Sequence, residues 1–223
     1  ITQIFNKCYL ILIMKNLNVL YQANDKYAPY AGVSILSLLQ NNKDFEEITV
    51  YLLDDNISKE NIDKVMEALS RSALPFNLGL LGGEPTLSPY YNYVIQKIRT
   101  LEKFSHVYVT TNAERDLKTV ETDGVAFLFS YHPADCTSDE RFLENVKYIY
   151  QKGNKCKVNI IIHPNRKFWP KSLNMAKAVQ ELGVKIHPHF IYGNWNRKLY
   201  KYHEGMYEYF SIFGDLEKDV KYD

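Results

Sequence analysis

The sequence has few cysteines, no long apolar run and almost no net charge, and each absence excludes a class of protein. Three cysteines in 223 residues, Cys8, Cys136 and Cys156, are far apart and odd in number, unlike a disulfide framework. They favour a reducing compartment, so we expect a cytoplasmic protein. The net charge of +1 offers no concentrated basic surface for a nucleic acid. The apolar stretch CYLILIM is too short to span a membrane and lacks the cleavage site of a signal peptide.

The chain also lacks a Gly/Ser-rich linker, an internal repeat and a low-complexity tract, so composition marks no domain boundary. The first residue is Ile1, and Met14 would make a reasonable start. We therefore expect residues 1–16 to be an N-terminal extension.

Short apolar runs alternate with helical patterns from residue 17 onward, which predicts an α/β fold with a mostly parallel sheet and crossover helices. Helix starts are predicted at Pro29, at an N-cap Ser58 flanked by the staple residues Ile57 and Ile62, at Ser88–Pro89, and at a Thr137–Glu140 capping box. The predicted strands are 17–22, 47–53, 76–81, 106–111, 125–130, 157–163 and 184–192, and a last helix is expected within 200–213.

The stretch LGLLGGEPTL, beginning at Leu78, has the most unusual composition at any predicted strand end, where ligands of parallel sheets bind. Adjacent glycines, Gly82 and Gly83, tolerate positive φ and let a ligand approach the backbone. Glu84 would then present a carboxylate suited to an ammonium group. The alternative is a plain strand-to-helix turn with Glu84 solvated.

This stretch closely resembles the GGEP motif of radical S-adenosylmethionine enzymes, and TTN (110–112) resembles the end of the next strand in that family. The resemblance covers residues 66–223. It implies a partial barrel in which Gly82, Gly83 and Glu84 contact the amino group of S-adenosylmethionine. It also implies, less strongly, that Ser130 contacts the ribose.

The same family holds a 4Fe–4S cluster with a CxxxCxxC loop upstream of the glycines, and this motif is missing. Cys8 is the only cysteine upstream. The cluster is therefore expected for the family, but its ligands are absent, and the radical chemistry does not follow for this chain.

The front of the chain, LNVLYQANDKYAPYAGVSILSLLQNN with EITVYLLDDNIS, resembles the start of family 8 glycosyltransferases, which have a GT-A fold. The resemblance covers residues 17–65. It implies that the loop QANDKY binds the uridine of a UDP-sugar through Ala23, Asn24, Asp25 and Tyr27.

That second resemblance is also incomplete, because the DxD motif that would hold Mn²⁺ is absent. Asp54 and Asp55 are interpreted as a solvated loop. His187 and His189, two apart on a strand, share a face, but we expect no metal site there or elsewhere.

The sequence thus predicts a composite chain with an incomplete active site from each of two families. The favoured interpretation is a radical S-adenosylmethionine-like protein that keeps the amino-group turn and is catalytically impaired. The alternatives are a glycosyltransferase-like protein that binds a UDP-sugar, and a non-enzymatic α/β domain. In each enzymatic case the partner is a small molecule; nothing in the sequence indicates a protein partner.

Overall fold

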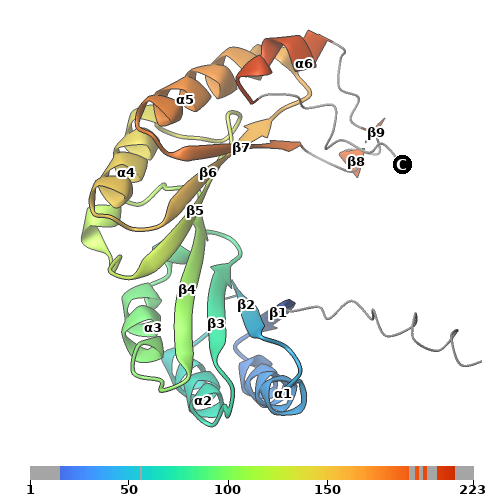
Figure 1. Ribbon diagram of the computed structural model, residues 1–223, viewed down its shortest axis with the longest axis vertical. Coiled ribbons are helices and arrows are strands. Elements are labelled where there is room, and N and C mark those ends of the chain that lie inside the picture. Colours follow the sequence, from blue (N-terminus) through green and yellow to red (C-terminus); the bar gives the residue numbers. More distant parts are fainter. Residues whose placement is uncertain (1–15, 56, 191–193, 196–197, 200–204, 214–223) are drawn as a thin grey trace, which may run out of the picture. The chain divides into compact units, whose positions relative to one another are not determined.

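The computed structural model describes residues 16–55, 57–190, 194–195, 198–199 and 205–213 (Figure 1). The predicted extension at residues 1–16, with Cys8, lies almost entirely outside this part. No helix among the described residues combines the length and apolar character needed to cross a membrane.

Seven strands form one parallel sheet in the order β1-β2-β3-β4-β5-β6-β7, with helices in the crossovers, as the sequence predicts (Figure 1). The strands are β1 (Asn16–Asn24), β2 (Glu47–Asp55), β3 (Phe76–Leu81), β4 (Phe104–Thr111), β5 (Val125–Tyr131), β6 (Cys156–Ile162) and β7 (Lys185–Phe190). The helices are α1 (Ala28–Asn41), α2 (Lys59–Ser70), α3 (Tyr91–Ile98), α4 (Asp139–Gln151), α5 (Trp169–Glu181) and the short α6 (Gly205–Tyr209). Two-residue strands β8 (Asn194–Trp195) and β9 (Lys198–Leu199) pair antiparallel in a separate sheet.

The chain divides into two compact units whose boundaries are not contiguous in sequence. Unit 1 contains residues up to 83 together with 88–108, and unit 2 contains 84–87 and everything from 109 onward. The boundary expected from the two resemblances, at residues 65–66, falls inside α2.

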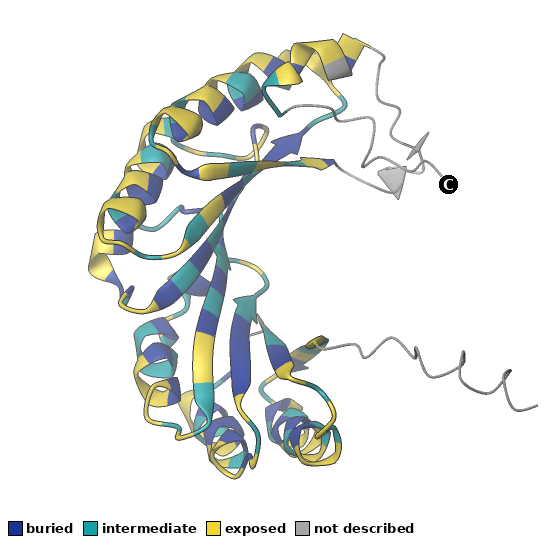
Figure 2. Ribbon diagram, in the orientation of Figure 1, coloured by how far each residue is buried: buried dark blue, intermediate teal, exposed yellow. Residues whose placement is uncertain are grey.

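Unit 1 buries one face of β1–β3 beneath its helices. Ile35 and Leu39 of α1, Leu69 of α2 and the strand residues Val50 and Leu78 are fully buried together. Exposed and less exposed residues alternate along β1 with the strand period of two, whereas β3 is buried over four consecutive residues, 76–79, as its dark blue colour in Figure 2 shows.

Unit 2 packs α4 against β5 through aromatic rings. Phe142 of α4 meets Phe129 at 5.9 Å and Tyr131 at 5.1 Å, both edge to face. In Figure 1, α4 and α5 lie along this one face of β5–β7, and the described part of unit 2 places no helix on the other face. Parallel sheets usually have both faces covered, so the second face of unit 2 is unusual.

Two predicted helix starts are wrong by a small, explicable margin. Ser138 caps α4, because its Oγ accepts from Arg141 N at 3.2 Å, whereas Thr137 and Glu140 form no capping box. The helix predicted from Ser88–Pro89 begins at Tyr91, since a 3₁₀ turn at Pro85–Leu87 precedes it and Ser88 Oγ accepts from Tyr90 N instead.

Other local predictions are confirmed. Ser58 caps α2 by accepting from Asn61 N, Ile57 and Ile62 beside it are buried, and β3 has the predicted bounds. The expected last helix is shorter: within 200–213 the described residues form α6 and a 3₁₀ turn at Ser211–Phe213, and 200–204 lie outside the described residues.

Candidate functional site

The GGEP turn follows β3 directly and requires both of its glycines. Gly82 has φ +88° and Gly83 has φ +40°, in the left-handed region that side chains with a Cβ rarely adopt. A Cβ built on Gly83 would meet no atom within 4 Å, so the space beside this residue is open. A ligand can therefore approach the backbone at Gly83.

The carboxylate of Glu84 is held in one orientation by four donors within unit 2. Its Oε1 accepts from Thr86 N at 3.1 Å, Thr86 Oγ1 at 2.7 Å and Thr111 Oγ1 at 2.6 Å. Its Oε2 accepts from Asn112 N at 2.6 Å. The two motifs quoted above, GGEP and TTN, thus meet in one hydrogen-bond network, so Glu84 is not a freely solvated residue of a plain turn.

The distribution of these donors is uneven. An ionised carboxylate offers about four acceptor positions over its two oxygens. Among the described residues, three donors converge on Oε1, while Oε2 receives one, from the residue after β4. Chemically, Oε2 is the atom on which a further donor such as an ammonium group could bind.

The loop after β4 is fixed by two residues that the sequence interpretation missed. Asn145 of α4 is buried, donates to the carbonyls of Ala113 and Arg115, and accepts from Leu117 N at 2.9 Å. Arg115 in turn donates to the Thr86 carbonyl at 2.8 Å. The available signal for Asn145 was a polar residue on the buried stripe of a helix, where polar groups need partners.

Ser130 lies on the open face of β5 and is half-buried. The strand register places it beside Asn159 of β6, which in turn pairs with His187 of β7. His187 and His189 share this face, as their spacing predicts, and both are exposed. The structure therefore brings Ser130 next to other hydrogen-bonding side chains of unit 2, which the sequence alone did not indicate.

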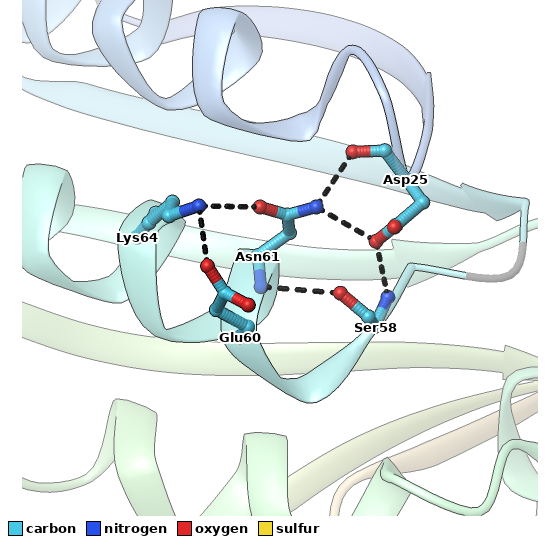
Figure 3. A network of polar contacts seen from close by, with 5 residues as sticks. All are labelled: Asp25, Ser58, Glu60, Asn61 and Lys64. Carbon is cyan, nitrogen blue, oxygen red and sulfur yellow. Dashed lines mark hydrogen bonds and ion pairs between the residues drawn. The ribbon is translucent and has the colours of Figure 1, made fainter.

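In unit 1, the loop QANDKY leaves β1 at its carboxyl end, but its acidic residue faces a helix of the protein (Figure 3). Asp25 Oδ1 accepts from Ser58 N at 2.6 Å and from Asn61 Nδ2 at 2.8 Å, and Asn61 also donates to the Asp25 carbonyl. Hydrogen bonds from Ser58 and Asn61 lower the pKa of Asp25, and Lys64, which is linked to Asn61 and Glu60, lowers it further.

The other residues of this loop are divided between core and surface. Ala23 is buried in β1, and Asn24, the last residue of that strand, is exposed and accepts from Tyr27 N. The Tyr27 side chain is 54% exposed, with Lys26 Nζ 5.5 Å from its ring centroid. The Tyr27 ring and Asn24 are therefore accessible to an outside ligand, while Ala23 is buried and Asp25 anchors α2. The prediction of a loop at Asp54 and Asp55 is wrong for the backbone, because β2 continues to Asp55 and pairs there with the end of β1. Their side chains lie outside the described residues.

The described cysteines do not fit a metal cluster. Cys136 and Cys156 are free thiols, on the loop after β5 and at the start of β6. Burial raises the pKa of both thiols, and the hydrogen bond to Asp139 raises that of Cys136 further. Among the residues that the structure describes, no group of three or more His, Cys, Asp or Glu side chains could hold a metal ion.

Comparison with known proteins yields no match: no protein-family model fits the chain, and no curated protein is significantly similar to it in sequence.

Proposed function

We propose that this chain is a radical S-adenosylmethionine-like protein that binds S-adenosylmethionine through the GGEP turn and is catalytically impaired. In this proposal residues 66–223 form a partial barrel of that family, joined to a GT-A-like start at residues 17–65. The partner is a small molecule. The cytoplasm is the proposed location, because widely spaced free thiols persist in a reducing compartment.

The observation that carries the proposal is the pairing of an open backbone with an oriented carboxylate. Gly82 and Gly83 both have positive φ, and the space beside Gly83 is open. Next to it, Glu84 is fixed by donors of which only one described group, Asn112 N, binds Oε2. A preoriented carboxylate binds an ammonium group without losing side-chain entropy at the moment of binding.

The bound S-adenosylmethionine would supply a sulfonium centre, whose reductive cleavage in the family depends on the cluster. In this chain Glu84 would bind the amino group, Gly83 would admit it, and Ser130 would contact the ribose. The thiols of Cys136 and Cys156 do not form a cluster site, and for this reason we propose binding with impaired catalysis.

The test compares two ligands that differ in the methionine moiety. Calorimetry should show that the protein binds S-adenosylmethionine more tightly than 5′-methylthioadenosine, which lacks the amino acid part. Glu84→Gln should weaken the binding of S-adenosylmethionine about 10- to 100-fold, which is the range expected for a lost charge-assisted hydrogen bond. The binding of methylthioadenosine should not change. Equal binding of S-adenosylmethionine by the wild type and a folded Glu84→Gln variant would remove the role given to Glu84.

A matched pair of glycine variants separates binding from folding. Gly83 and Gly153 both have positive φ and open space beside them, at +40° and +85°. An alanine at either position introduces similar backbone strain, about 1–2 kcal/mol. Only Gly83→Ala should weaken the binding of S-adenosylmethionine. An equal loss of affinity in both variants would show that the substitutions act through stability alone.

A second candidate, a glycosyltransferase-like protein that binds a UDP-sugar, is favoured by one observation, the exposed ring of Tyr27 at the end of β1. Because Asp25 is bonded to α2 and a DxD motif is missing, we expect weak UDP binding that does not change with Mn²⁺. Tyr27→Leu should abolish it. If neither S-adenosylmethionine nor UDP binds, the chain is the non-enzymatic α/β domain.

A further inference from the structure

The open face of the unit 2 sheet carries cations and no carboxylate from its own strands. Parallel pairing places Lys157 of β6 directly beside Lys185 of β7. Both alternate along their strands with Val158 and Ile186, which are in register with Phe129 under α4, so the lysines lie on the opposite face. Both lysines are exposed, and no described residue forms an ion pair with either of them. The strands β4 to β7 contain no Asp or Glu at all.

This pairing is costly for the sheet itself. Like charges directly opposite on neighbouring strands destabilise the pair, and a neutral or acidic residue at either position would relieve the repulsion. A parallel sheet also normally has a helix over each face, which is missing here among the described residues. The lysine pair therefore contributes nothing evident to folding, and an anion between the two ammonium groups would stabilise it.

The neighbouring row on the same face is uncharged and rich in hydrogen-bonding groups. Ser130, Asn159 and His187 lie side by side on β5, β6 and β7, and this row is two residues along the strands from the lysines. Two residues further along, Ile161 of β6 pairs with His189 of β7. His132 follows the end of β5 and is close enough to His189 for their charges to interact.

We propose that this face binds a phosphomonoester, with Lys157 and Lys185 on the phosphate and the row Ser130, Asn159 and His187 on a polar remainder. A phosphate carries about −1.5 to −2 charges at pH 7, which matches two lysines better than the single charge of a carboxylate. The patch is only two lysines wide, which suits one phosphate group and not the backbone of a nucleic acid. The proposal uses neither Glu84 nor the turn, and it shares only Ser130 with the proposed S-adenosylmethionine site. The phosphate contacts, Lys157 and Lys185, belong to this proposal alone, so substituting them tests it separately from S-adenosylmethionine binding.

The probe is inorganic phosphate, added to the full chain and followed through the His187 ring resonances by NMR. We expect a saturable shift with a dissociation constant on the order of 1 mM, and a weaker response to acetate. Lys157→Gln and Lys185→Gln should each weaken the binding of phosphate about tenfold or more. Both variants should keep or raise the melting temperature, because the repulsion is gone.

Lys147→Gln is the matched control, since Lys147 is an exposed lysine of α4, on the helical side of the unit. It changes the net charge by the same amount and should leave phosphate binding unchanged. Glu84→Gln should leave it unchanged as well. The proposal is overturned by the absence of a saturable shift in the wild type, or by an equal loss in Lys147→Gln and Lys157→Gln.

Discussion

The Asp25 loop of unit 1 and the Glu84 turn of unit 2 offer the same chemistry at the end of a parallel strand, but they use it differently. Among the described residues, the donors to the Asp25 carboxylate are the N-cap residue Ser58 and Asn61 in the first turn of α2, so this acid holds the start of a helix. The donors to Glu84 come from its own turn and from the end of β4, and none belongs to the first turn of an α-helix. A helix cap accounts fully for Asp25, whereas anchoring does not explain why two left-handed glycines precede Glu84.

This comparison shows that a strand-end carboxylate is informative only together with its surroundings. For each acid the sequence predicted a ligand contact from a family resemblance, and both resemblances stay predictions. What distinguishes them is the open backbone at Gly83, which has no counterpart beside Asp25.

The largest effect on stability is expected from Asn145→Ala, which would remove the hydrogen bonds that hold the loop after β4 in unit 2. The buried carboxamide satisfies three backbone groups, and its removal leaves them unpaired. We expect a loss of about 3 kcal/mol in the free energy of unfolding, measured by urea denaturation. Asn174→Ala, at an exposed position of α5, is the matched control and should change stability little. Similar values for both variants would contradict the support role.

Glu84→Gln should have an intermediate effect and sharpens the comparison directly. An amide nitrogen cannot accept from Asn112 N or from the threonine donors, so at least one of the four bonds is lost. We expect a loss of about 1–3 kcal/mol in the free energy of unfolding. Glu181→Gln, exposed at the end of α5, controls for the charge change. A Glu84→Gln variant as stable as wild type would show that the network does not hold the turn.

Asp25→Asn should have the smallest effect and a distinct pH dependence. The pKa of Asp25 is lowered from 3.8 by its hydrogen bonds to Ser58 and Asn61, so its stabilisation is complete above that value and is lost as the pH falls below it. The melting temperature of Asp25→Asn should lie a few degrees below that of wild type at pH 7. This difference in melting temperature should become smaller below about pH 3.8. A difference that grows there would contradict the proposed stabilisation of α2 by the Asp25 carboxylate.

Local sequence signals predicted the fold well because they depend on neighbouring residues. The bounds of β3, the Ser58 cap and the burial of Ile57 and Ile62 follow from residues within a few positions of one another. The error at the start of α4 is also local, since the actual cap, Ser138, directly follows the predicted Thr137.

The interactions within the candidate site could not be predicted in this way. Asp25 reaches Asn61 across 36 positions, Thr111 reaches Glu84 across 27, and Asn145 reaches Ala113 across 32. The Lys157–Lys185 pair depends on the strand register, which a sequence without relatives does not fix to one residue. Residue types indicated where ligands could bind, and the tertiary structure decided which carboxylate was already in use.

The four residues 84–87 belong to unit 2 although the chain on either side of them belongs to unit 1. A single cut in the gene therefore cannot separate the two units: a fragment beginning at residue 109 would retain Thr111 and Asn112 but lose the carboxylate that they bind. The units cannot be inherited or exchanged as independent cassettes.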